Sequence, residues 1–213
     1  MNKIKKIAII GLGYVGLPLA VEFARKYKTF GYDINQNRVN ELNNFNDSTL
    51  EVSSKDLKSI VSINNKDNNK SGLYISTDIS NIKEADIYII TVPTPTDKNK
   101  NPILKPLISS SESVGKLLKK NNIVIYESTV YPGVTEDICV PILEEFSGLK
   151  LNNEFSVGYS PERINPGDKE RTVTKILKVT SGSNPQAAKL IDNLYKSIIK
   201  AGTHLAPSIK VAE

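Results

Sequence analysis

KIAIIGLGYVGLPLAVEFA, residues 6–24, is the stretch that decides the fold. It begins with an apolar run typical of a buried strand, and the apolar spacing of residues 17–27 indicates a helix directly after it. Between the two, Gly11, Gly13 and Gly16 form the spacing G-x-G-x-x-G. Because this spacing lies between a strand and a helix, it predicts a loop that binds the phosphates of a dinucleotide.

Each glycine of this loop has a separate mechanical reason. Gly11 permits a tight turn, Gly13 lets the backbone approach a pyrophosphate, and Gly16 lets the helix pack closely on the strand. The start of the helix adds N–H groups without intrahelical partners and a partial positive charge, which favour an anion. We therefore expect the three glycines, with Tyr14 and Val15 between them, to bind the cofactor. Core packing and a contact with the substrate are alternatives for Tyr14.

Asp33 indicates which cofactor this is, because it ends the second predicted strand about 20 residues after Gly13. A carboxylate there accepts hydrogen bonds from both ribose hydroxyls of NAD and repels the additional phosphate of NADP. Arg38, on the next predicted helix, is placed to stack over the adenine or to reach the ribose. The sequence thus predicts NAD as the cofactor. The alternatives are that Asp33 is a surface residue in a turn and that Arg38 is a solvated arginine without a contact to the cofactor.

The rest of the chain alternates between apolar runs and helical patterns. Because the apolar runs are continuous, we expect a sheet covered on both faces. The alternation predicts an α/β protein with a doubly wound parallel sheet, extended by further strands toward the C-terminal end. Strands are expected over residues 4–10, 28–33, 73–77, 85–92, 122–129, 154–160 and 176–182, and helices over 17–27, 35–44, 106–120, 133–146 and 184–202.

Two polar segments, residues 64–72 and 93–102, are predicted to be loops. The first has the low complexity of a surface excursion. The second directly follows a predicted strand, and ligands in an open α/β sheet bind at the carboxyl ends of strands.

Composition excludes several other classes of protein. The 213 residues carry a net charge of +5, but the lysines are spread along the chain, and no basic helix, zinc spacing or aromatic RNA-binding signature indicates a nucleic-acid partner. No apolar run approaches the roughly 20 residues of a membrane span. The single Cys139 cannot form an internal disulfide, which fits a cytoplasmic location, and we assign no metal ligand.

Four motifs occur in order: GLGYVGLPLA at residues 11–20, TVPTPTD at 91–97, ESTVYPGVTE at 127–136 and YSPERINPGD at 159–168. Together they resemble the nucleotide-sugar 6-dehydrogenases, the UDP-glucose/UDP-N-acetylhexosamine/GDP-mannose dehydrogenase family. The last motif is most similar to the branch that oxidises UDP-N-acetylglucosamine or UDP-N-acetylgalactosamine for surface polysaccharides.

The resemblance implies a Rossmann-type domain, a UDP-sugar substrate and a homodimer or larger homo-oligomer for the full-length protein. It also implies oxidation of the sugar C6 alcohol to a carboxylate in two NAD-dependent steps, through a thioester on a cysteine.

The resemblance also assigns roles to individual residues. Thr94 is expected near the cofactor, and Thr129 near both the nicotinamide and the reacting carbon, where its hydroxyl would hold a water or the alcohol oxygen. Glu162 matches the glutamate that assists hydrolysis of the thioester. Arg163 and Ile164 are expected to contact the substrate. All of these residues except Ile164 also have a purely structural alternative. These are a turn-forming threonine for Thr94, a strand-end cap for Thr129, a solvated loop glutamate for Glu162 and a surface salt bridge for Arg163.

The resemblance further divides the chain into an NAD-binding domain over residues 1–206 and the truncated start of a central linking helix over 207–213. Ser208 is a plausible N-cap of that helix. The family's cysteine nucleophile, its lysine beyond a VAE stretch and its UDP-binding domain have no counterpart here. Cys139 is predicted to be a core residue of the 133–146 helix. We therefore expect this chain to bind NAD without turning over substrate.

Two other functions stay open at this stage. An NAD-dependent 3-hydroxyacid dehydrogenase begins with a similar glycine loop, but it would not need the SPER sequence at residues 160–163. A regulatory module that binds NAD without catalysis would explain the missing nucleophile. Continuation of the reading frame past Glu213 into a lysine and a glycine-flanked cysteine would favour the nucleotide-sugar dehydrogenase.

Overall fold

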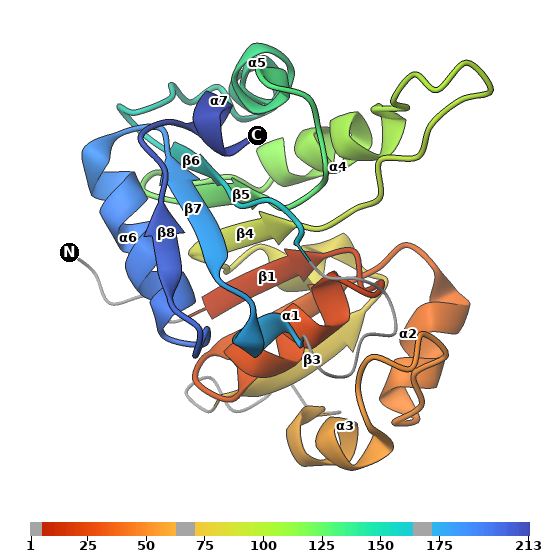
Figure 1. Ribbon diagram of the computed structural model, residues 1–213. Helices are drawn as coiled ribbons and strands as arrows, with labels where there is room; N and C mark the ends of the chain where they lie inside the picture. The colour runs from red at the N-terminus through yellow and green to blue at the C-terminus, as the bar shows by residue number, and fades with distance from the viewer. Residues whose placement is uncertain (1–5, 63–70, 164–171) are drawn as a thin grey trace.

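The computed structural model describes residues 6–62, 71–163 and 172–213. Its centre is an eight-stranded sheet in the order β3-β2-β1-β4-β5-β6-β7-β8 (Figure 1). The strands are β1 (Lys6–Ile10), β2 (Lys28–Tyr32), β3 (Gly72–Ser76), β4 (Ile87–Ile90), β5 (Ile123–Tyr126), β6 (Ser156–Tyr159), β7 (Lys178–Gly182) and β8 (Thr203–Leu205).

The first six strands are parallel, and their order is that of a dinucleotide-binding doubly wound sheet. β7 joins β6 in antiparallel pairing, and β8 is parallel to β7. The predicted fold class is therefore confirmed, including the extension at the C-terminal end.

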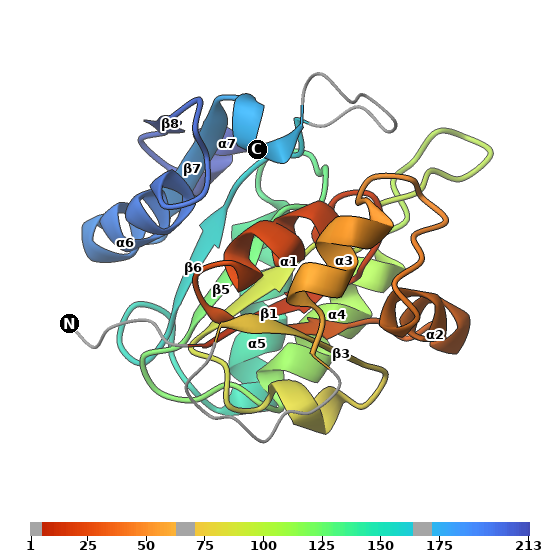
Figure 2. The same cartoon turned by 90° about the horizontal axis from the view of Figure 1, so that it is seen from below.

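Alternate side chains of each central strand enter two different cores. Ile7 and Ile9 of β1 belong to the core under α1 (Gly16–Ala24), α3 (Ser54–Ile60) and α6 (Pro185–Lys196). Ala8 and Ile10 belong to the core under α4 (Lys105–Gly115), α5 (Val140–Ser147) and α7 (Ile209–Ala212). Figures 1 and 2 show these two groups of helices on opposite sides of the sheet. The central strands β1, β4 and β5 are largely apolar because both faces are covered.

The structure differs from the sequence-based expectations in several elements. The helix α3, the 3₁₀ segments over Ile79–Ile82 and Val173–Lys175, and the strand β8 lack a long periodic pattern and were not predicted. The helix expected over residues 133–146 is π-helical over Val134–Cys139 and becomes α-helical at α5. Pro141 lies where the two forms meet and has no N–H to donate to the preceding turn. The loop expected over residues 64–72 falls largely outside the described residues.

The last described residues pack against the beginning of the π-helical segment. Ser208 caps α7, as predicted, with its Oγ accepting from the Val211 N–H at 3.2 Å. The Glu213 carboxylate then accepts from the N–H groups of Gly133, at 2.5 Å, and Thr135, at 2.8 Å. No helix within the described residues is long and apolar enough to cross a membrane.

Candidate cofactor and active site

The glycine loop joins β1 to α1 at the point where strand order reverses, between β1 and β4. Gly11 has a φ of +94°, a conformation that side chains disfavour. At Gly16 a Cβ atom would stand 1.9 Å from the Gly11 carbonyl oxygen and 2.4 Å from Thr91 Oγ1. At Gly13 a Cβ would meet nothing within 4 Å. Gly11 and Gly16 are thus required by the fold itself, whereas Gly13 borders space that a bound group can fill.

Thr91 holds this loop from the neighbouring strand, and sequence reasoning did not identify it. Its buried hydroxyl lies 2.7 Å from the Gly11 carbonyl oxygen and 3.0 Å from that of Ile10. The contact depends on the register of β1 against β4, which pairs Ile10 with Ile90. The TVPTPTD motif contains Thr91, but only the sheet register reveals what it contacts.

The start of α1 is open to an anion. The N-cap residue Val15 makes no side-chain capping bond, and the first turn holds no acidic residue. Tyr14 is 40% exposed, whereas Val15 is buried at 8%, so Val15 would reach a ligand through its backbone N–H. Free N–H groups and the partial positive charge of the helix end both favour a phosphate.

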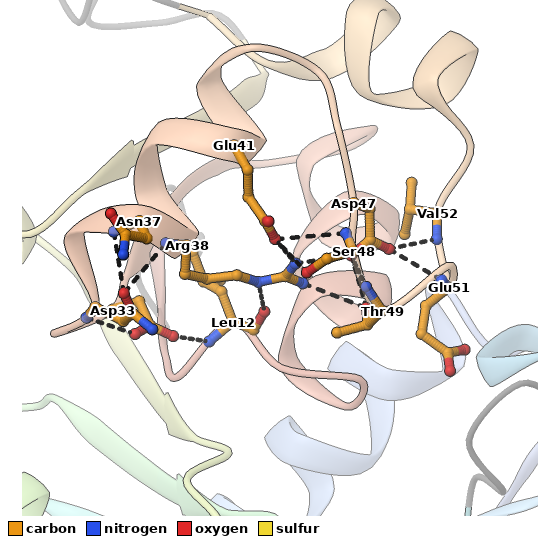
Figure 3. Close-up of polar contacts among 11 residues, drawn as sticks. Leu12, Asp33, Asn37, Arg38, Glu41, Asp47, Ser48, Thr49, Glu51 and Val52 are labelled. Carbon is orange, nitrogen blue, oxygen red and sulfur yellow. Dashed lines mark hydrogen bonds and ion pairs between the residues drawn. The ribbon is translucent and has the colours of Figure 1, made fainter.

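Asp33 directly follows β2 and lies beside this loop (Figure 3). Its Oδ2 accepts from the Leu12 N–H at 2.8 Å, and its Oδ1 accepts from the Asn35 N–H at 2.9 Å. Both bonds fix the carboxylate against the loop, and each oxygen keeps a further lone pair. Asp33 can therefore accept hydrogen bonds from ribose hydroxyls, and its contact with NAD stays a prediction.

Arg38, expected to contact the adenine or ribose, is buried beneath the glycine loop (Figure 3). Its Nε donates to the Leu12 carbonyl at 2.8 Å, and one Nη donates to Asp47 Oδ1 at 2.8 Å and to Glu41. Arg38 therefore supports the loop from inside the protein. A contact with the cofactor stays a prediction.

Asp47 supports the glycine loop through Arg38. Like Thr91, it was not identified from the sequence. Burial would raise the pKa of Asp47, but hydrogen bonds from Thr49, the Val52 N–H and Arg38 hold it below its ordinary value. The carboxylate of Asp47 is thereby kept charged opposite Arg38. No local pattern in the sequence signals this ion pair.

The remaining predicted site residues follow the next strands along the same sheet edge. Thr94 follows β4, and its Oγ1 is buried without a hydrogen-bond partner among the described residues. Thr129 follows β5 and is exposed. Glu162, which is half-buried, and Arg163, which is exposed, follow β6. Ile164 lies outside the described residues.

Cys139 is buried, as predicted, and packs in the core under α4 and α5. Burial raises the pKa of its thiol to about 11, although hydrogen bonds with Ser111 and Tyr126 act in the lowering direction. A thiol that is both buried and protonated is a poor nucleophile.

The residues present fit NAD. The open space beside Gly13 and the uncapped start of α1 suit the pyrophosphate, and Asp33 suits the adenosine ribose. The Thr94 hydroxyl, which is buried without a partner among the described residues, can donate a hydrogen bond to a bound group. The fold and this row of groups together define the cofactor-binding domain of a nicotinamide-dependent dehydrogenase.

Comparison with known proteins names the family. Residues 5–199 match the UDP-glucose/GDP-mannose dehydrogenase family, NAD binding domain, and the chain belongs to this family. It is 57% identical over 208 residues to a UDP-N-acetyl-D-glucosamine 6-dehydrogenase of Pseudomonas aeruginosa, and 54% identical over 208 residues to one of Salmonella typhi. Each match covers 98% of this chain and 47% of the relative. The chain therefore spans about half the length of these relatives.

A solved structure is similar over the same extent. The NDP-N-acetyl-D-galactosaminuronic acid dehydrogenase of Methanosarcina mazei Go1 superposes with a TM-score of 0.84 at 29% identity, covering 99% of this chain and 46% of that one. Family membership confirms the resemblance deduced from the four motifs and supports NAD as the cofactor. It also sets aside the 3-hydroxyacid dehydrogenase alternative.

Proposed function

We propose that this chain is the cofactor-binding half of a nucleotide-sugar 6-dehydrogenase. In this reaction the C6 alcohol of UDP-N-acetylhexosamine, or of UDP-glucose, becomes a carboxylate for surface polysaccharide synthesis. One alcohol, two NAD⁺ and one water yield one carboxylate, two NADH and three protons. The observation that carries the proposal is the row of site residues along one sheet edge: the glycine loop, Asp33, Thr94, Thr129 and Glu162 follow β1, β2, β4, β5 and β6.

Each group in the row has a separate task in this proposal. When bound, NAD supplies the hydride acceptor. The glycine loop and Asp33 hold its phosphates and ribose, and the Thr94 hydroxyl donates to it farther along the edge. The Thr129 hydroxyl orients the alcohol oxygen or the hydrolytic water. Glu162 takes a proton from that water as the thioester is hydrolysed.

Residues 1–206 form the NAD-binding domain in this proposal, and residues 207–213 begin the helix that links it to a second half. That half would supply the cysteine nucleophile, the lysine and the UDP site. The preference for UDP-N-acetylglucosamine is supported by the two relatives that are UDP-N-acetyl-D-glucosamine 6-dehydrogenases, and its galactosamine epimer by the similar Methanosarcina mazei structure. We further propose a cytoplasmic homodimer or larger homo-oligomer for the full-length protein, with Arg163 and Ile164 contacting the substrate.

The test joins the 213 residues to the C-terminal half of the Pseudomonas aeruginosa relative. NADH formation is followed with UDP-N-acetylglucosamine, UDP-N-acetylgalactosamine, UDP-N-acetylmannosamine and UDP-glucose. We expect two NADH per sugar, with an N-acetylhexosamine preferred. A fusion that folds and binds NADH but oxidises none of them would favour the non-catalytic NAD-binding module instead.

A further inference from the structure

A buried ion pair joins the start of β7 to the segment that leads from β5 to Thr129. Lys178, the first residue of β7, and Glu127, directly after β5, are 3% and 1% exposed. The Lys178 ammonium lies 2.6 Å from Glu127 Oε2. The other carboxylate oxygen of Glu127 accepts from the hydroxyl of Tyr195, which extends from α6.

Stability alone does not account for such a pair. Both charges lose their hydration on burial, and replacing a buried pair by apolar side chains of similar volume is often neutral or stabilising. A further role of the pair is therefore to be found in its other contacts. The second hydrogen bond of the Lys178 ammonium indicates which role this is.

Lys178 Nζ also donates to the carbonyl oxygen of Pro161, at 3.1 Å. This peptide bond leads directly into Glu162. The ladder between β5 and β6 ends just before it, where the Ser160 N–H donates to the Tyr126 carbonyl at 2.9 Å. Pro161 has no N–H, so only its carbonyl offers a hydrogen bond to anchor the backbone at this point.

The same ammonium thus joins the two segments of the proposed active site. Glu127 stands two residues before Thr129, and Pro161 stands one residue before Glu162. Burial raises the pKa of the Tyr159 hydroxyl to about 12, and the charges of Glu213, Glu127 and Glu162 act in the same direction.

We propose that Lys178 and Glu127 are a positioning pair that fixes the Pro161–Glu162 segment relative to Thr129 for the hydrolysis step. This inference rests on the proposed function for the role of Glu162, but not for the anchoring itself. The pair contacts neither substrate nor cofactor in this role. It acts by keeping the Glu162 carboxylate where the hydrolytic water must be deprotonated, and small displacements of catalytic groups are costly.

The first experiment measures the anchoring in the 213-residue chain. The double variant Glu127→Gln/Lys178→Met removes both charges, retains an acceptor for Tyr195 and keeps the volume of the lysine stem. The matched control is Lys28→Met, which removes a buried lysine at the opposite end of the sheet, on β2. Amide hydrogen exchange is followed by mass spectrometry in peptides covering residues 159–163, and NADH affinity is measured in parallel.

In the double variant we expect exchange of the Ser160 N–H, which donates to the Tyr126 carbonyl next to the anchored Pro161, to accelerate about tenfold to a hundredfold, as for loss of a charge-assisted hydrogen bond. Exchange in β1 and β4, the unfolding midpoint and NADH affinity should stay near parental values. The Lys28→Met control should leave exchange at residues 159–163 unchanged. Parental exchange at Ser160 in a folded double variant would overturn the proposal.

The second experiment measures catalysis in the fusion with the relative's C-terminal half. In the double variant kcat should fall at least tenfold with KM for the sugar unchanged, while the first hydride transfer, measured in a single turnover, keeps its rate. A double variant with parental kcat, beside a Glu162→Gln variant that is impaired, would overturn the positioning role. If Glu162→Gln itself turns over normally, the proposed role of Glu162 fails, and the exchange result still decides the anchoring.

Discussion

Replacing Gly13 by alanine tests whether this glycine is needed for the fold or for binding the cofactor. The added Cβ meets no atom of the protein within 4 Å, and the backbone of Gly13 is outside the left-handed region. The folded state is therefore expected to tolerate alanine, with a gain of about 0.4–1 kcal/mol in the free energy of unfolding because the unfolded chain loses freedom. Any loss of cofactor binding then comes from the methyl group meeting the pyrophosphate.

We expect NADH affinity to fall by about 2–3 kcal/mol, roughly 30- to 150-fold in Kd, the scale of forcing a methyl group into a filled contact. Gly13→Val should abolish binding while leaving the fold largely intact. Titration calorimetry with NADH and chemical unfolding of the same samples provide the two measurements.

Gly16→Ala is the matched control, with the same chemical change three residues away. Its Cβ would stand 1.9 Å from a backbone oxygen of the loop. We expect this variant to lose several kcal/mol of stability, about 3 kcal/mol or more, before any effect on binding is considered. Parental NADH affinity in Gly13→Ala would show that the pyrophosphate does not lie against this glycine, and the placement of the cofactor would be wrong.

The remaining predictions concern the cofactor's ribose, the support of the loop and the buried thiol. The chain should bind NADH more tightly than NADPH by about 1–3 kcal/mol. Asp33→Ala should reduce this difference in binding free energy because it weakens NADH binding. Equal affinities of the parent for NADH and NADPH, measured by calorimetry, would contradict the role of Asp33. Arg38→Met should lower the free energy of unfolding by about 3–5 kcal/mol at pH 7, because it leaves Asp47 charged and buried without its cation. Because the pKa of Asp47 is lowered in the folded state, its charge stabilises the fold above the ordinary pKa of an aspartate, and this stabilisation is lost as the pH falls through the pKa of the folded state. Urea unfolding between pH 7 and pH 3 measures the loss of stability in Arg38→Met and its dependence on pH. If the free energy of unfolding of Arg38→Met depended on pH as that of the parent does, the pairing of Arg38 with Asp47 would be contradicted. Cys139 should react with a thiol reagent at pH 8 only as fast as the chain unfolds, and Cys139→Ser should change stability slightly. The 213-residue chain by itself should form no NADH from any UDP-hexose; turnover that disappears in Cys139→Ser would overturn this.

Local patterns in the sequence determined much of this protein. The alternation of apolar runs with helical patterns predicted the fold class. The spacing of Gly11, Gly13 and Gly16 between a strand and a helix, with Asp33 after the second strand, predicted the cofactor. These signals are local because each glycine is required by the turn in which it lies, and Asp33 directly follows the second strand. The four ordered motifs led to the family, which comparison with relatives confirmed.

Contacts between distant segments were decided only by the tertiary structure. The sequence indicated that Arg38 is a solvated residue or contacts the adenine. In the structure Arg38 is buried between the Leu12 carbonyl and Asp47. Lys178 and Glu127 are 51 residues apart and carry no pattern that links them. A residue's charge and its place in a helix or strand are local properties. Its partner depends on sheet order and register, which the long crossovers of a doubly wound fold set only once the whole chain is packed.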